Sequence, residues 1–497
     1  MATDFIDAFR RLQRHERRQA LDALATELTS SEWRALISSR TFHCDFIRRL
    51  PLELVAHVFS HLDVAAPYRL RIVSKHWNHK LGSLHILKTG LDQWYQGTAD
   101  LGDADHALCE RKARAIHAFR TGKPTSVIKI ILDEQPAQPI LAGNHLVLGR
   151  FERHVHVLNL DSWQLRSLCG EAREKLSGVF VSDQIIALTT YSNICYVYEL
   201  QGGQVPKKFS VPNMMYFTSV ACRGRTIACV AHLAKRTTVF IWEYNTQRGR
   251  SFEVSHGPDS LFPELDSDPP ARKLVPPLLQ PEAETIILFS LFGHSSDDPK
   301  GGKHLAFSRY TYSGECIGTF RPCFPGLNKM ELFNSANGFV PVNHDGSLLA
   351  MRIYWISQSM DSPCLLRFDE KANDLRVWEG SEFPAPEPLK NERGTMAWLN
   401  DTCYGFKTRP SDAKVQDMVA YMGTKDTKTY TLIVSEQRSS YLAIERAIMT
   451  NGEYVIRTHN KSFFILCFDD DDNGSRPKES DSFFDIGELE VLFSSRN

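Results

Sequence analysis

The residues that could bind a metal ion or act in catalysis are scattered along the chain of 497 residues, which contains 18 histidines and 11 cysteines. No two cysteines form a CxxC pair. The closest cysteines are not at zinc-ligand spacings: Cys222/Cys229 and Cys316/Cys323. His154 and His156 lie two residues apart in a predicted strand, where packing or surface exposure is more common than metal binding. We find no metal-ligand spacing among the histidines and expect no metal site.

The sequence also has none of the short motifs that accompany common catalytic chemistry. It contains no Walker phosphate-binding loop, no GxGxxG, no HExxH and no GxSxG nucleophile elbow. We therefore predict no catalytic residue and no cofactor, and expect a protein that works by binding.

Composition excludes several classes of partner. Hydrophobic residues make up 42% and charged residues 24%, as in globular proteins, and the net charge of −1 does not favour nucleic acid. No apolar run reaches about 18 residues, and residues 1–28 are rich in arginine, so we expect neither a membrane span nor a secretory signal. An odd number of cysteines without such a signal is typical of the cytoplasm or nucleus.

The first third of the chain has helical periodicity. Apolar residues recur every three or four positions through residues 5–37. The segment Thr29-Ser30-Ser31-Glu32 has the capping-box pattern, which predicts that one helix ends near Leu28 and another begins near Ser31. This region also contains most of the basic excess, because residues 1–90 hold 14 Lys/Arg and 9 Asp/Glu.

A more specific pattern follows between residues 45 and 84. Pro51 suits a first helical position, and Leu54, Val58 and Leu62 form an apolar stripe. After a break near Pro67 comes a second short helix, and Ser74 is placed to cap a third helix that carries Trp77. Three short helices form a bundle too small to bury its own apolar stripe, so the exposed face must contact something else.

These residues resemble an F-box, the module that docks onto the Skp adaptor of cullin-RING ubiquitin ligases. The match consists of Leu50-Pro51-x-Glu53-Leu54, Val58-Phe59-x-x-Leu62 and Val73-Ser74-x-x-Trp77, in that order and spacing. A generic helical hairpin is the alternative. The resemblance implies an adaptor-binding surface with its supporting core, made of Leu50, Pro51, Leu54, Val58, Phe59, Leu62, Leu70, Val73 and Trp77.

The flanking segments extend the resemblance to F-box/WD-repeat proteins. Asp45-Phe46-Ile47 is similar to the segment that leads into the F-box of those receptors, and the helices of residues 1–40 take the place of their dimerisation region. These helices could instead pack back on the F-box or linker. Residues 97–105 read as a loop, and 110–122 as a helix that ends at Gly122 and resembles the linker before the propeller.

From residue 126 onward the chain alternates short strands with turns. The strands Val155–Leu158, Cys195–Tyr198 and Val239–Trp242 return at intervals of about 40 residues, which is the period of a four-stranded propeller blade. We predict about seven blades, with six or eight, or a pair of β-sandwiches, as alternatives. Residues 409–417 read as a long loop, and the apolar-acidic tail 483–492 as a strand that returns to the sheet. No repeat has the Gly-His and Trp-Asp pairs of typical WD repeats.

The sequence thus predicts a multidomain α+β protein, with N-terminal helices and a three-helix F-box bundle followed by an all-β propeller. The predicted regions are 1–40 (possible homodimerisation), 44–90 (F-box), 91–124 (helical linker) and 125–497 (propeller). The resemblance implies a non-catalytic substrate receptor of a Skp–cullin–F-box ubiquitin ligase. In this reading the F-box binds the Skp adaptor and, through it, cullin, while the propeller binds a protein substrate.

Three other functions stay open at this stage. They are a scaffold that acts with the Skp adaptor outside a ligase, an enzyme with an active site in the propeller, and a reader of phosphopeptides. A reader would need basic side chains on one propeller face, for which the candidates are Arg225, Arg236 and Arg352.

Overall fold

The computed structural model divides into two compact units, residues 1–86 and 87–497. The described residues are 8–9, 11–32, 45–62, 65–132, 139–149, 154–171, 174–203, 205–211, 219–233, 236–255, 276–293, 303–320, 340–344, 346–354, 363–378, 397–400, 402–409, 412–422, 425–433, 448–459, 462–469 and 487–494. Among them, no helix is both long enough and apolar enough to cross a membrane.

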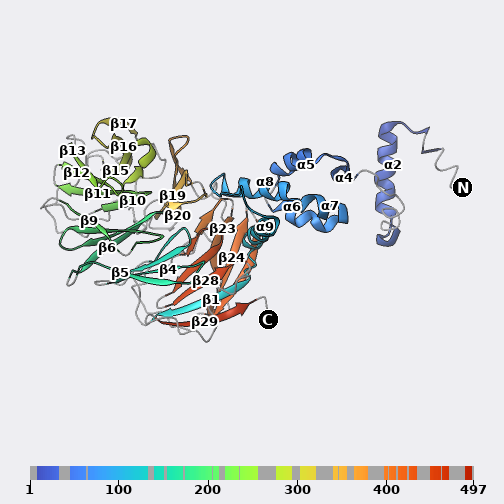
Figure 1. Cartoon of the computed structure of the whole chain (residues 1–497). Helices are drawn as coiled ribbons and strands as arrows, with labels where there is room; N and C mark the ends of the chain where they lie inside the picture. The colour runs from blue at the N-terminus through green and yellow to red at the C-terminus, as the bar shows by residue number, and fades with distance from the viewer. Residues whose placement is uncertain are drawn as a thin grey trace. The chain divides into compact units, whose positions relative to one another are not determined.

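The first unit is helical, as predicted (Figure 1). Its elements are α2 (Arg14–Glu27), α4 (Phe46–Arg49), α5 (Leu52–Ser60), α6 (Ala66–Leu70), the 3-10 turn η1 (Arg71–Val73) and α7 (Lys75–Leu81). The predicted capping box is confirmed. The Thr29 amide donates to Glu32 Oε2 at 2.9 Å, and the Glu32 amide donates to Thr29 Oγ1 at 3.3 Å. The predicted apolar positions Trp33, Leu36 and Ile37 lie outside the described residues.

Two turn residues set the helix boundaries of the bundle. Pro51 is the residue before α5, with φ −54° and ψ 154°, so the prediction that it is the first helical residue is wrong by one position. Proline fits there because its ring fixes φ near −65° and the chain is still extended. Ser74 caps α7 as predicted, since its hydroxyl accepts a hydrogen bond from the Trp77 amide at 3.2 Å.

Two longer helices precede the strands. Helix α8 (Leu84–Tyr95) was not identified separately in the sequence, and α9 (His106–Thr121) begins four residues before the predicted Glu110. It begins there because the Asp105 side chain accepts from the Leu108 amide at 2.8 Å. It ends as predicted at Gly122, whose left-handed φ of 65° suits glycine.

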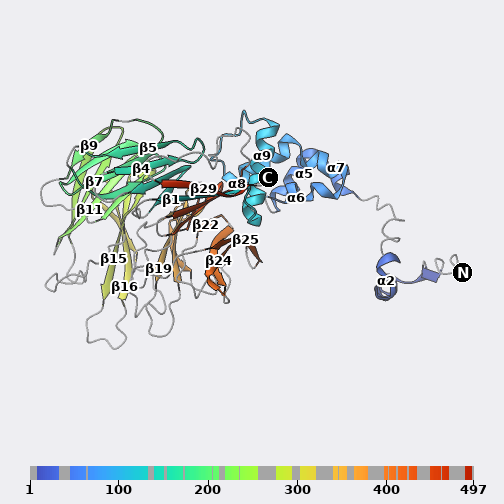
Figure 2. The ribbon, with the colours of Figure 1, turned by 90° about the horizontal axis from the view of Figure 1, so that it is seen from below.

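The strands of the described residues form seven antiparallel sheets in chain order, which confirms the predicted propeller of about seven blades. Figure 2 shows several of these sheets from below. The first three blades are β2 (Ile140–Ala142), β3 (His145–Gly149), β4 (His154–Asn159), β5 (Leu165–Cys169); β6 (Leu176–Val181), β7 (Ile185–Thr190), β8 (Ile194–Glu199), β9 (Lys207–Ser210); and β10 (Ser219–Arg223), β11 (Thr226–Leu233), β12 (Arg236–Glu243), β13 (Arg248–Ser255).

The next three blades repeat the same four-stranded meander. They are β14 (Leu278–Gln280), β15 (Thr285–Gly293), β16 (Lys303–Thr311), β17 (Cys316–Phe320); β18 (Val340–Pro341), β19 (Leu348–Tyr354), β20 (Pro363–Asp369), β21 (Asp374–Trp378); and β22 (Ala397–Leu399), β23 (Thr402–Arg409), β24 (Asp412–Met422), β25 (Lys425–Ile433). The prediction of a loop over residues 409–417 is wrong, because residues 412–417 lie in β24, where Asp412, Gln416 and Asp417 pair with β23 and residues 415–417 pair with β25. Their polar composition hid the strand.

Both ends of the strand region close the seventh blade. Its order is β26 (Ile448–Thr450), β27 (Tyr454–His459), β28 (Ser462–Cys467), β1 (Ser126–Leu132) and β29 (Gly487–Ser494). The first strand, β1, therefore lies between β28 and β29 and is antiparallel to both (Figures 1 and 2). The predicted return of the C-terminal tail to the sheet is confirmed.

The hydrophobic core lies between successive blades. In β3, Leu146 and Leu148 pack toward Tyr454 and Ile456 of blade 7, whereas Val147 packs toward blade 2. Successive side chains of a strand point to opposite faces, and both faces of a blade are covered. This explains why second strands such as β3 and β7 read as continuous apolar runs rather than as an alternation.

Basic side chains add polar contacts between the first blades. Arg166 donates to the Gly202 and Glu199 carbonyls at 3.0 and 2.9 Å, and Lys207 donates to the Tyr244 carbonyl at 2.9 Å. Each of these residues belongs to the fourth strand of its blade and reaches the next blade. They occupy the same register position, opposite Val157 and Val197. The repeat is therefore visible in this contact even without Trp-Asp pairs.

Candidate functional site

The small bundle of α4–α7 has a core of its own. Ile47, Val55, Phe59 and Leu81 are buried, and partly buried Leu50, Leu70 and Trp77 pack against this cluster. Four of the nine residues predicted for adaptor binding therefore belong to the supporting core: Leu50, Phe59, Leu70 and Trp77.

Two polar side chains attach the short helix α4 to α7. Asp45 Oδ1 accepts the Trp77 indole N–H at 2.8 Å and the Arg48 amide at 3.1 Å. At the other end of α4, the Lys80 ammonium donates to the carbonyls of Ile47 and Leu50 at 2.7 and 2.6 Å. The exposed amides and carbonyls at both ends of α4 are thus paired, which explains why the segment before Pro51 is part of the bundle.

The remaining predicted residues are at the surface. The exposed fraction is 49% for Leu54, 37% for Val58, 45% for Leu62 and 55% for Val73, and Pro51 is exposed as well. Ile72, which the sequence analysis missed, is 92% exposed. Ile72 lies in η1, next to the predicted Val73, and this neighbour in the predicted second helix could have indicated it as a docking residue. Large apolar side chains gathered at the surface of one small domain are typical of a protein-docking face.

A second site of interest is the junction at which α8 and α9 meet the propeller (Figure 1). Phe119 is fully buried, with ring centroids 6.0 Å from Trp94, 5.1 Å from Tyr404 and 5.3 Å from Phe468. The Tyr404 hydroxyl donates to the Phe119 carbonyl. Since Tyr404 comes from blade 6 and Phe468 follows the third strand of blade 7, the end of α9 is anchored to the last two blades.

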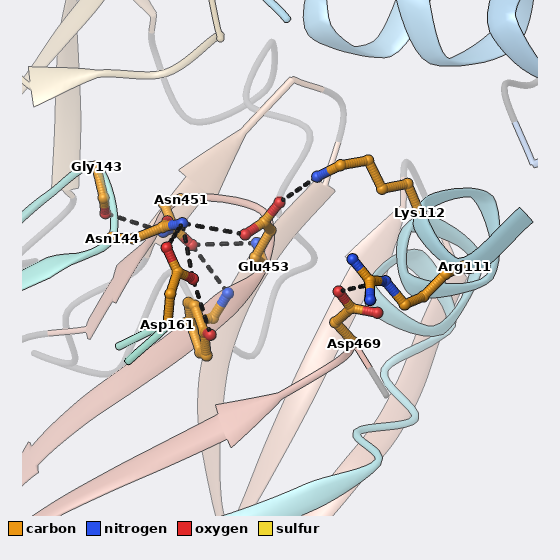
Figure 3. Close-up of polar contacts among 9 residues, drawn as sticks. Arg111, Lys112, Gly143, Asn144, Asp161, Asn451, Glu453 and Asp469 are labelled. Atoms are coloured by element: carbon orange, nitrogen blue, oxygen red, sulfur yellow. Dashed lines mark hydrogen bonds and ion pairs between the residues drawn. The ribbon is translucent and has the colours of Figure 1, made fainter. Parts of the chain in front are cut away.

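Polar contacts anchor the first half of α9 (Figure 3). Lys112 Nζ lies 3.1 Å from Glu453 Oε1, and Arg111 Nε lies 3.4 Å from Asp469 Oδ2. The other Glu453 oxygen accepts from Asn144 Nδ2 at 3.3 Å, and Asn144 also donates to Asp161 at 2.9 Å. Because Glu453 belongs to blade 7 and Asn144 to blade 1, α9 is bonded to the network that spans the seam at which the propeller closes.

Two groups near this network have shifted pKa values. Burial is the largest single effect on Lys112 and would lower its pKa, but Glu453, Tyr95 and Asp469 together outweigh burial and raise the pKa to about 12. Burial, with a further contribution from Glu453, raises the pKa of Tyr95 to about 12. Both shifts show that Lys112 stays charged and Tyr95 neutral in a partly desolvated contact.

All these contacts lie at one end of the propeller, which we call the helix end. It carries the turns between the first and second strands, including Asn400, Asn144 and Glu453, and those between the third and fourth strands. Asn400 Nδ2 donates to the Trp94 carbonyl at 3.2 Å. Arg225 also lies at this end, whereas Arg236 begins β12 at the opposite end, so the proposed phosphopeptide arginines do not share one face.

Within the described residues, no three or more His, Cys, Asp or Glu side chains are grouped so as to hold a metal ion. The prediction that no two histidines lie at a metal-ligand spacing is wrong, however, because His57, in the last turn of α5, and His61, its C-cap residue, are four residues apart. Their ring centroids lie 4.8 Å apart.

Comparison with known proteins agrees with the bundle assignment. Residues 47–80 match the F-box-like family. No curated protein sequence matches the chain. The chain thus has an F-box-like domain near its N-terminus, followed by a β-propeller.

Several solved structures are similar to the propeller region at low identity. A chain of the mitotic checkpoint complex is 10% identical, with 70% of this chain and 93% of that chain covered and a TM-score of 0.38. The propeller domain of Cps50 (Swd1) from Myceliophthora thermophila is 9% identical, with 68% and 99% covered and a TM-score of 0.40. The propeller domain of the Trilobed protease from Pyrococcus furiosus is 12% identical, with 69% and 97% covered and a TM-score of 0.37.

Proposed function

We propose that this protein is the substrate-recognition subunit of a Skp–cullin–F-box ubiquitin ligase. The observation that carries the proposal is the set of exposed apolar side chains on the F-box-like domain, which we take as its docking face: Leu54, Val58, Leu62, Ile72 and Val73. In the proposal this face binds the Skp adaptor, and through it cullin, while the propeller binds a protein substrate. The ligase would act in the cytoplasm or nucleus.

The chain itself would perform no covalent step. Ubiquitin transfer is chemistry of a conjugating enzyme, which the RING subunit recruits. The receptor would instead hold a substrate lysine near the thioester, which turns a bimolecular encounter into a local one. This role requires that the segments between the substrate and the adaptor keep a fixed orientation. The contacts that hold α9 on the propeller supply part of this rigidity.

The opposite end of the propeller is the surface we assign to the substrate. Helices α8 and α9 contact turns of blades 5, 6 and 7 at the helix end, through His344, Asn400 and Glu453. Of the turns between second and third strands at that opposite end, the structure describes residues 191–193, where Tyr191 is 70% exposed. Turns on a rigid scaffold are the usual place for binding residues.

Charge insertion on the docking face tests the adaptor assignment. Leu54→Asp and Val58→Asp place a carboxylate on a half-exposed side chain, which the bundle can hydrate without unfolding. An interface that must bury this charge should lose adaptor binding, because an unpaired buried charge costs several kcal/mol, about 2–5 in measured interfaces. Co-purification with the Skp adaptor is the measurement.

Val205→Asp is the matched control. Val205 is 84% exposed on the propeller, so this variant introduces the same carboxylate away from the docking face of the F-box-like domain. Adaptor binding that survives both F-box variants would contradict the proposal. Capture of the Skp adaptor without cullin would favour the scaffold function instead.

The position of a flexible insertion tests the positioning role. A Gly/Ser insertion before α8, after Ser83, separates the F-box from a segment that is itself attached to the propeller. The same insertion at Gly122 leaves α9 held by its side-chain contacts. We expect the first to lower ubiquitination far more than the second, with adaptor and substrate binding retained in both. Equal turnover of both variants would contradict rigid positioning.

Self-association through residues 1–40 is also part of the proposal. Helix α2 lies in this region and precedes the bundle in the chain. Deletion of residues 1–40 should convert a dimer to a monomer, measured as mass in solution by light scattering. A monomer before and after deletion would contradict this role.

A further inference from the structure

His57 and His61 form a pair of imidazoles on the surface of the F-box-like domain. His57 lies in the last turn of α5, His61 is the C-cap residue four positions later, and both residues are exposed. The rings meet edge to face, with centroids 4.8 Å apart and planes at 82°. Spacing of four brings two side chains to the same face of a helix, one turn apart.

This arrangement matches the chemistry of a metal ligand pair. Neutral imidazole is the commonest protein ligand for zinc and similar divalent ions. Two histidines at i and i+4 of one helix are also the spacing with which helical zinc motifs bind one ion. Glu53, one turn before His57, adds a negative charge to the same ridge of α5.

We propose that His57 and His61 bind a divalent transition-metal ion, of the zinc class, through their two imidazole rings. Within the described residues no third side chain completes the set, so water would fill the remaining positions. Such a site binds through chelation by two rings. Removal of either ring should therefore lower the affinity for the ion by much more than twofold, because the remaining ring loses the gain from chelation.

The pair also borders the docking face. His57 is the i+3 neighbour of Leu54, and His61 is the i+3 neighbour of Val58, and both of these apolar side chains are exposed. A bound dication with its waters would have to be desolvated when a partner covers this stripe, which costs free energy. We therefore infer that the metal ion and the partner compete for this face, an inference that rests on the proposed adaptor binding.

Titration of the full chain with Zn²⁺ tests the site directly. Isothermal calorimetry should detect a zinc site that is weakened on the order of 10²-fold in His57→Gln and in His61→Gln, since each removes the intramolecular second bond. His154→Gln, an exposed histidine of the propeller, is the matched control and should leave this site unchanged. Absence of zinc binding, or equal affinity in His57→Gln and the native chain, would overturn the proposal.

A second measurement separates this inference from the proposed function. Capture of the Skp adaptor by the native chain is compared in EDTA and in Zn²⁺, with His57→Gln treated in the same way. We expect zinc to weaken capture by the native chain and to have little effect on the variant. Equal zinc sensitivity in both would overturn the competition. Failure of capture even in EDTA would instead contradict the proposed adaptor role, whereas the zinc titration would still decide the metal site.

Discussion

Removal of the Phe119 ring should destabilise the propeller unit. Phe119 is fully buried, and its ring contacts those of Trp94, Tyr404 and Phe468. Truncation of a buried phenylalanine to alanine typically costs about 3–5 kcal/mol, which includes the cavity left behind. Each of the three aromatic pairs contributes about 0.5–1.5 kcal/mol beyond area burial, which places Phe119→Ala at the upper part of that range.

Urea unfolding followed by far-ultraviolet circular dichroism measures this effect, because the strands of the second unit dominate the signal. With a slope of about 3 kcal/mol/M or more for a unit of this size, a loss of about 4 kcal/mol lowers the midpoint by roughly 1 M. Tyr191→Ala is the control, since Tyr191 is an aromatic side chain that is 70% exposed. Its effect should stay within about 0.5 kcal/mol. Midpoints that fall equally in both variants would show that α9 does not contribute to the stability of the propeller.

Three further changes test single contacts. Gly122→Ala should cost about 1 kcal/mol in thermal unfolding, because a left-handed φ of 65° is strained for alanine. Lys80→Met should lower the stability of the bundle by about 2 kcal/mol, measured in the same way, because carbonyls at the end of α4 lose a charged donor. Because the pKa of Lys112 is raised, the contribution of its charge to the stability of the propeller unit is complete below about pH 10.5. This contribution is lost as the pH rises through about 12. In Glu453→Gln this alkaline loss should be smaller when urea midpoints are compared from pH 9 to 12, and an unchanged pH profile would contradict the assigned cause.

Local chemistry is what made much of the fold predictable. The capping box at Thr29, the cap at Ser74 and the glycine stop at Gly122 each depend on residues within a few positions of one another. The prediction of about seven blades followed from a period of about 40 residues in the first repeats, from an allowance for long loops, and from the F-box that precedes the strands. The F-box-like bundle was predictable for the same reason, because its apolar stripe and its caps are short-range patterns.

Long-range pairing is what the sequence did not reveal. Lys112 and Glu453 are 341 positions apart, and the Arg223 guanidinium donates to Glu370, 147 positions away, at 3.0 Å. Nothing in the local pattern of either residue indicates its partner. The division of the F-box residues into core and surface was hidden as well. Leu54 and Phe59 are both apolar on one short helix, and only the packing of α4 and α7 decides which of them stays exposed.

The placement of α9 changes how the chain should be divided. Read along the sequence, residues 91–124 look like a spacer between two domains. In the structure, α9 contributes a fully buried ring and two ion pairs to the seam at which the propeller closes. The seam needs such support, because its blade is assembled from both ends of the strand region, with β1 inserted between β28 and β29. A helix that stabilises the closing blade is also held firmly on the propeller, because bending it away would break contacts within the fold. Stability of the propeller and positioning of a substrate would then depend on the same residues, so variants such as Phe119→Ala should reduce both together.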